Sequence, residues 1–114
     1  MLRNRLKEML SEGKLPVGHM IAEFATRGIG LLVDAAGADF AIIDMEHSGF
    51  GMHQVADLLV WLKASNVTPF VRVPQVEYHF IARVLDAGAL GVMVSNVRTA
   101  GEAKAIVDAA KYKG

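Results

Sequence analysis

Short apolar segments alternate with amphipathic segments along the whole chain, and this alternation limits the fold more than any other feature. Four apolar runs occupy residues 17–22, 40–45, 68–73 and 91–94. They are continuous rather than interrupted at every second position, as is typical of strands that are buried on both faces of a parallel sheet. The sequence therefore predicts four strands of this kind.

Helical patterns precede, separate and follow these runs. Apolar residues recur at helical spacing within residues 2–10, 55–62, 80–85 and 103–110. A weaker pattern covers residues 26–36, because Gly28 and Gly30 fall within it or just before it and glycine disfavours helix. Gly37 and Gly88 stand where a glycine commonly ends a helix. The predicted order is a leading helix followed by four strand–helix units.

Four such units fit either one half of a (β/α)8 TIM barrel or a small, open, doubly wound sheet, both of the α/β class. The doubly wound sheet would be complete at 114 residues, whereas a complete barrel needs about 250. Periodicity alone does not choose between the two folds. In either fold we expect residues 1–114 to form a single domain.

The composition argues against several classes of protein. Twelve basic and 12 acidic residues give a formal net charge of zero, so we expect neither nucleic acid nor an anionic membrane as a partner. The absence of cysteine excludes disulfides, zinc–thiolate sites and thiol nucleophiles. No apolar run approaches the roughly 20 residues that span a bilayer. The first 12 residues alternate charged with apolar side chains, unlike a secretory signal. We therefore expect a soluble, cytoplasmic protein.

Polar residues follow each predicted strand, at the end where parallel α/β folds place their active sites. These residues are Glu23, Asp44, Glu46, His47, Arg72, Ser95 and Asn96. They come from segments that lie far apart in the sequence. A parallel sheet would bring them together at one end.

The residue types suit proton transfer beside a carbonyl or carboxylate group. A carboxylate such as Asp44 can orient the His47 imidazole and raise its basicity. The fork of donors on Arg72 suits a carboxylate or an enolate oxygen. Structural roles remain open at this point, because Asp44 or Ser48 would equally serve in an Asx turn or a helix cap. Arg72 would equally pair with a buried acid such as Glu46.

Three ordered motifs resemble those of the HpcH/HpaI aldolase family. Residues 39–47 are similar to the family's second strand, which ends in Asp-x-Glu-His, and residues 69–74 to its third strand, with Val-Arg-x-Pro. Residues 85–92 are similar to the following helix-to-strand turn, Leu-Asp-x-Gly-Ala-x-Gly. The resemblance runs in order over residues 14–112. It implies the N-terminal half of a (β/α)8 barrel, which favours the barrel over the doubly wound sheet.

The resemblance also implies an activity, that of a metal-dependent class II aldolase. Such a carbon–carbon lyase acts on pyruvate-like 2-oxo acids through an enolate. His47 would be the acid/base with Asp44 as its partner, and Arg72 would hold the oxygens of pyruvate and stabilise the enolate. Asp86 would reach the active site of a neighbouring subunit. The divalent metal would be Mg²⁺ or Mn²⁺.

The chain departs from the family pattern in two places. The family's metal-binding carboxylates come from strands five and six, so we expect no metal ligand within these 114 residues. Ser95 and Asn96 stand where the family usually has Pro-Met. We therefore expect weak or no aldolase activity from the chain alone.

Four strands would leave two open edges and an uncovered inner face, which favour self-association. We expect a homo-oligomer that forms through these edges, with two copies supplying eight strands. The alternative function is a non-catalytic half-barrel module for binding or assembly, derived from such an aldolase. A receiver-type open sheet is disfavoured, because its first strand should end in paired acids and only Glu23 is present there.

Overall fold

A single parallel sheet organises the chain. The computed structural model describes residues 5–74, 78–95 and 97–111. Its elements are α1 (Arg5–Ser11), β1 (Gly18–Ile21), α2 (Ile29–Ala35), β2 (Phe40–Asp44), α3 (Met52–Lys63), β3 (Thr68–Val73), α4 (Tyr78–Asp86), β4 (Gly91–Val94) and α5 (Ala100–Lys111). All four predicted strands are confirmed. The predicted helices are confirmed as well, although α2 begins at Ile29 rather than at residue 26.

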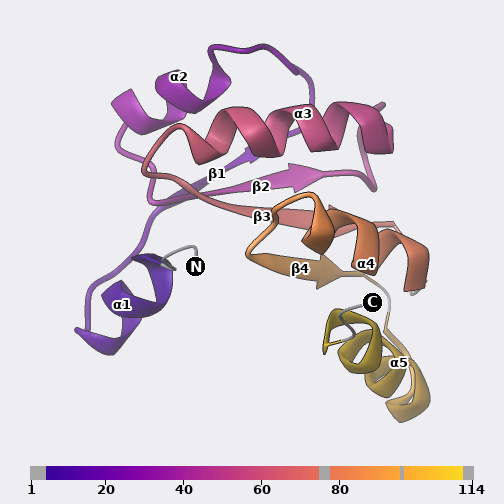
Figure 1. Cartoon of the computed structure of the whole chain (residues 1–114). Coiled ribbons are helices and arrows are strands. Elements are labelled where there is room, and N and C mark those ends of the chain that lie inside the picture. Colours follow the sequence, from indigo (N-terminus) through magenta and orange to yellow (C-terminus); the bar gives the residue numbers. More distant parts are fainter. Residues whose placement is uncertain (1–4, 75–77, 96, 112–114) are drawn as a thin grey trace.

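The order of the strands decides between the two folds that periodicity left open. The strands lie in the sheet in the order β1-β2-β3-β4, and each pair of neighbours is parallel. A doubly wound sheet reverses its strand order at a switch point, whereas a (β/α)8 barrel adds each strand beside the last. The described strands contain no reversal. Figure 1 shows α2, α3 and α4 along one face of this sheet. The chain therefore has the architecture of half a barrel.

The hydrophobic core lies between the sheet and these helices. Its largest fully buried side chains are Ile43, Leu58, Leu59, Leu62, Ile81, Val55, Val71, Val73 and Val84. Four of them come from α3, at the helical spacing that the sequence predicts. In the part of the chain that the structure describes, no helix is both long and apolar enough to cross a membrane.

The opposite face of the sheet carries an aromatic pair. The rings of Phe40 and Phe70 pack edge to face with centroids 6.0 Å apart. Gly18 on β1 and Gly91 on β4 stand beside them, and a Cβ atom at either glycine would lie within 2.6 Å of a ring. The Phe40 ring thus packs against Gly18 of β1, and the Phe70 ring against Gly91 of β4. In a complete barrel this face would be the interior, which side chains of all the strands fill.

Helix α1 attaches at the amino end of the sheet. Arg5 donates from Nη1 to the carbonyl of Asn66 and from Nη2 to Oδ1 of Asp39, both at 3.0 Å. Oδ2 of Asp39 accepts the backbone N–H of Val17 at 2.9 Å. Leu2, part of the predicted apolar face, lies outside the described residues, and no described residue of α1 is buried. Polar contacts therefore attach this helix more than an apolar face does.

Glycines explain two further local features. Gly37 and Gly88 have φ angles of +87° and +120°, which confirms the prediction that they end helices. Gly30 lies inside α2, and a Cβ atom there would stand 2.5 Å from the carbonyl oxygen of Trp61. This glycine therefore allows α2 to approach the backbone of α3 closely.

Candidate active site

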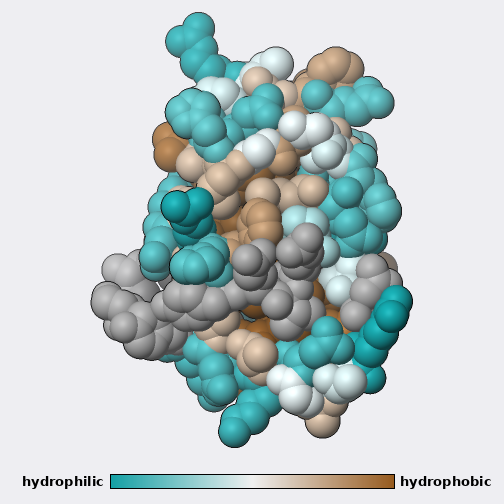
Figure 2. Space-filling view, turned by 90° about the vertical axis from the view of Figure 1, so that its right-hand side faces the viewer, coloured by the Kyte–Doolittle hydropathy of each residue, from teal (hydrophilic) through white to brown (hydrophobic). Residues whose placement is uncertain are grey.

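Polar side chains at or just after the ends of β2, β3 and β4 meet at the carboxyl end of the sheet. The strands of Figure 1 point toward this end, and Figure 2 looks onto it. In Figure 2 patches of apolar surface are visible near the middle of the view, and hydrophilic residues predominate at its margins. Asp44, the last residue of β2, is in register with Arg72 of β3, and Arg72 is in register with Met93 of β4. The sheet therefore brings together residues that the sequence separates.

Arg72 is the centre of this cluster. Its Nη2 donates to Oε1 of Glu46 at 3.4 Å, and its Nε donates to Oγ of Ser95 at 3.1 Å. Its Nη1 lies 3.8 Å from Oδ2 of Asp44, which is an ion pair but too long for a hydrogen bond. The side chain remains 22% exposed. The guanidinium is thus held on several sides while part of it stays open to a ligand.

Asp44 has a structural role in the turn that follows β2. The residue is buried, and its Oδ1 accepts the backbone N–H groups of Glu46 at 2.8 Å and His47 at 3.2 Å. The hydroxyl of Ser48 donates to the Asp44 carbonyl. These contacts form the Asx turn that the sequence offered as one reading. Asp44 therefore shapes the loop that carries His47.

The imidazole of His47 pairs with Glu46. Its Nε2 lies 2.9 Å from Oε1 of Glu46, whereas no ion pair joins the imidazole to the carboxylate of Asp44, both of which the structure describes. In the tautomer that carries its hydrogen on Nε2, this hydrogen would face the Glu46 carboxylate and Nδ1 would be left to accept a proton. The side chain is 66% exposed, so a ligand can reach it.

Glu46 links the imidazole and the guanidinium. Its Oε1 contacts both Nε2 of His47 and Nη2 of Arg72. Its Oε2 is buried and has no hydrogen-bond partner among the described residues. Sequence reasoning gave Glu46 no specific role toward His47. Its place in the Asp-x-Glu-His motif was the available signal.

The remaining candidates lie outside this cluster. Glu23 follows β1 at the same end of the sheet but is exposed and makes no ion pair with Arg72. Asp86 ends α4 and is exposed, near the amino end of β4 and therefore at the opposite end of the sheet. Asn96 lies outside the described residues. Within its own chain, Asp86 thus does not join the cluster.

The cluster by itself does not fit a divalent metal. Among the residues that the structure describes, no three His, Asp or Glu side chains are grouped so that they would hold a metal ion. One oxygen of Asp44 is already occupied by backbone amides, and Oε1 of Glu46 faces two donors.

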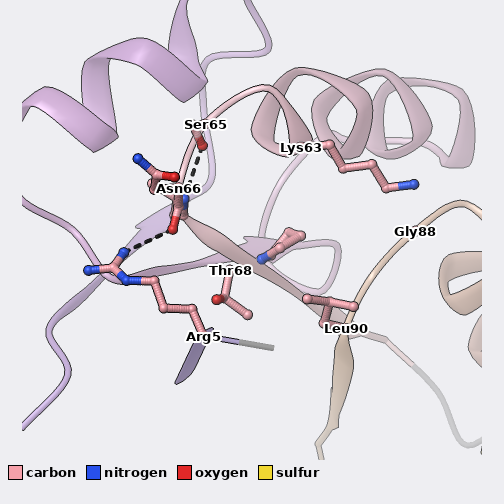
Figure 3. A pocket seen from close by; sticks show the side chains of 9 residues that line it. Arg5, Lys63, Ser65, Asn66, Thr68, Gly88 and Leu90 are labelled. Carbon is pink, nitrogen blue, oxygen red and sulfur yellow. Dashed lines mark hydrogen bonds between the residues drawn. The ribbon is translucent and has the colours of Figure 1, made fainter. Parts of the chain in front are cut away.

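A separate cavity of about 180 Å³ lies at the amino ends of β3 and β4. It is lined by Arg5, Lys63, Ser65, Asn66, Val67, Thr68, Pro69, Gly88 and Leu90. Figure 3 shows Arg5 directed to the carbonyl of Asn66, while Lys63 extends toward Gly88. Thr68 begins β3 whereas Arg72 lies near its end, so most of the strand separates the two places. This cavity belongs to the attachment of α1.

Comparisons with known proteins agree on one family. The family model described as HpcH/HpaI aldolase/citrate lyase matches residues 32–114. A hydroxypyruvate/pyruvate aldolase from Roseobacter denitrificans is 38% identical over 111 residues, which cover 96% of this chain and 42% of that protein. A 4-hydroxy-4-methyl-2-oxoglutarate aldolase from Hapsidospora irregularis is 40% identical over 82 residues, which cover 71% of this chain and 30% of that protein.

A solved structure gives the same result for the fold. The HpcH/HpaI aldolase from Desulfitobacterium hafniense superimposes with a TM-score of 0.86 at 36% identity, over 94% of this chain and 41% of that one. The chain thus spans about two fifths of the length of this aldolase and of the Roseobacter relative.

Proposed function

Because the chain belongs to the HpcH/HpaI aldolase/citrate lyase family, we propose that it carries the substrate-anchoring and acid/base part of a class II aldolase site. The substrates are 2-oxo acids related to pyruvate, and the reaction breaks or forms a carbon–carbon bond through an enolate. Residues 1–114 are one domain, the N-terminal half of the barrel. We place the protein in the cytoplasm as part of the same proposal.

One observation carries the proposal. The Arg72 guanidinium lies beside the exposed His47 imidazole. A single carboxylate oxygen of Glu46 contacts both groups. A fixed guanidinium suits a carboxylate and the oxo group beside it. An imidazole whose Nε2 lies beside a carboxylate can use Nδ1 for proton transfer. The two functions that a 2-oxo acid aldolase needs from side chains are therefore adjacent.

In this proposal each residue has a distinct task. Arg72 binds the oxygens of the 2-oxo acid and stabilises the negative charge that grows on the oxo oxygen as the enolate forms. His47 takes the proton of the substrate hydroxyl through Nδ1 as the carbon–carbon bond breaks, and a proton later returns to the enolate carbon. Glu46 orients the His47 ring. Asp44 acts on His47 through the backbone of the turn.

The metal is part of the proposal for the family-type site, but its ligands are not among the described residues of this chain. Mg²⁺ or Mn²⁺ would be held by other chain segments. Asp86 would act only in the active site of a neighbouring subunit. For this reason we propose that the 114-residue chain has weak or no aldolase activity alone. The second candidate is a non-catalytic half-barrel module for binding or assembly. The exposed apolar sheet edges favour this candidate.

A calorimetric titration with oxamate tests the proposal. Oxamate is an unreactive analogue of pyruvate that keeps the carboxylate and the adjacent carbonyl. We expect the purified chain to bind oxamate, because Arg72 is already positioned. We expect the affinity for oxamate to rise when Mg²⁺ or Mn²⁺ is added together with the chain segments that would hold the metal. The absence of any binding under either condition would favour the non-catalytic module. Robust metal-dependent cleavage of a 2-oxo acid by the chain alone would contradict the weak activity that we propose.

Exposed apolar residues at both edges of the sheet support self-association. Leu15, Val17 and Phe24 flank β1 and are 86%, 60% and 68% exposed, and Met93 on β4 is 44% exposed. Unpaired strand edges with apolar side chains favour pairing with another chain. We therefore include in the proposal a homo-oligomer in which β4 of one copy pairs with β1 of another.

Sedimentation measures this oligomer. We expect the chain to sediment as a dimer or a larger species, and we expect Met93→Lys to shift it toward the monomer, because the substitution places a charge at the pairing edge. Val60→Lys is the matched control. Val60 is 61% exposed on α3, a helix that packs on one face of the sheet and not at its edges. A wild-type chain that stays monomeric at every concentration tested would rule out the oligomer.

A further inference from the structure

Ser95 is the contact of Arg72 that the family resemblance does not supply. The family usually has proline after the fourth strand, and proline offers no side-chain acceptor. Here the hydroxyl oxygen of Ser95 accepts the Nε–H of Arg72 at 3.1 Å, across neighbouring strands. Ser95 directly follows β4 and is half-buried, so its hydroxyl is partly shielded from water.

The remaining contacts of the guanidinium show what this hydrogen bond does. Glu46 accepts from Nη2, so Ser95 and Glu46 together hold Nε and Nη2. Nη1 lies 3.8 Å from the carboxylate of Asp44 and makes no hydrogen bond among the described residues. A ligand therefore meets a guanidinium whose Nε is already used, and it must bind through the Nη atoms.

Without the hydroxyl, one restraint on this orientation disappears. Glu46 would then be the single hydrogen-bonding partner of the Arg72 side chain among the described residues, and its contact of 3.4 Å is at the long end of the range. The long Arg side chain has many rotamers, and a ligand that binds a mobile guanidinium must first order it. Loss of the Ser95 hydroxyl should therefore weaken ligand binding without disturbing the fold.

We propose that Ser95 is a positioning residue, which fixes the Arg72 guanidinium so that the Nη atoms face an incoming 2-oxo acid. The ligand part of this inference rests on the proposed function. The hydrogen bond itself does not, and it can be measured without a ligand.

The experiment compares Ser95→Ala, Ser95→Thr and the wild-type chain. Ser11→Ala is the control, because it removes a hydroxyl from α1 at the other end of the sheet. The first measurement is the exchange rate of the Arg72 Nε–H in ¹⁵N-labelled chain, with the signal assigned by its loss in Arg72→Lys. We expect slow exchange in the wild type, Ser95→Thr and Ser11→Ala. In Ser95→Ala we expect exchange that is about tenfold faster or more, because the protecting hydrogen bond is absent.

The second measurement is oxamate affinity by calorimetry. We expect Ser95→Ala to weaken it by about five- to tenfold, the effect of losing a hydrogen bond to a charged group, and we expect Ser95→Thr to restore it. An Nε–H that exchanges rapidly in the wild type, or equally slowly in Ser95→Ala, would overturn the proposal. Unchanged oxamate affinity in Ser95→Ala would overturn it as well. If the wild type binds no oxamate although its Nε–H is protected, the proposed function fails and not the hydrogen bond.

Discussion

Replacement of Arg72 with alanine is expected to weaken oxamate binding by about a hundredfold, equivalent to about 3 kcal/mol. Arg72 is the charged donor at the centre of the cluster, and its side chain is held by Ser95 and Glu46 while 22% of it stays exposed. Alanine removes both the positive charge and the fork of donors. It also leaves the carboxylate of Glu46 without its cation, which further disfavours an anionic ligand. Calorimetry measures the loss directly.

Two further variants make this result specific. Arg98→Ala removes an exposed arginine from the segment after β4, so oxamate affinity should remain unchanged. Arg72→Lys keeps the charge but lacks the planar fork, and we expect an affinity between those of the wild type and Arg72→Ala. If Arg72→Ala bound oxamate as tightly as the wild type, any oxamate site on this chain would lie elsewhere.

Replacement of Leu59 with alanine is expected to lower the free energy of unfolding by about 2–5 kcal/mol. Leu59 lies on α3 and is fully buried between this helix and the sheet. Truncation removes apolar contacts and leaves a cavity, because the rigid sheet does not move in to fill it. Such a loss is a large part of the total stability of about 5–15 kcal/mol that is usual for a domain. Urea unfolding followed by circular dichroism measures the change.

The neighbouring residue on the same helix is the matched control. Val60 is 61% exposed, so Val60→Ala should change the free energy of unfolding by only about 0.5 kcal/mol. Equal losses in Leu59→Ala and Val60→Ala would mean that α3 does not pack on the sheet as the structure describes.

The elements of the fold could be predicted from local patterns. The continuous apolar runs marked the strands to within one residue of their observed bounds, and the spacing of Val55, Leu58, Leu59 and Leu62 marked α3. These predictions succeed because burial on both faces of a strand, or on one face of a helix, leaves a direct trace in the order of apolar residues. The weakest helix prediction placed the start of α2 at residue 26, before its observed start. Gly28 stands outside α2, so the helix begins only at Ile29.

The sequence predicted which residues form the candidate site, but not which of their side chains contact one another. Position after a strand selected Asp44, Glu46, His47, Arg72 and Ser95. The expected pairing of Asp44 with the His47 imidazole is replaced in the structure by one with Glu46. Spacing along the chain does not reveal this, because the turn after β2 directs the side chains and Asp44 accepts hydrogen bonds from the backbone of that turn.

The sequence by itself determined where the strands and helices lie, which ordered motifs the chain carries and which polar residues end the strands. These properties depend on residues close to one another in the chain. Periodicity left the order of the strands open, and the half-barrel was implied only by the resemblance of the motifs. The tertiary structure shows that the strands follow one another without a reversal. It also decided that Glu46 and Ser95, from different strand ends, hold Arg72. The physical reason is that strand order, register and side-chain direction arise from contacts between distant segments, which no local pattern records.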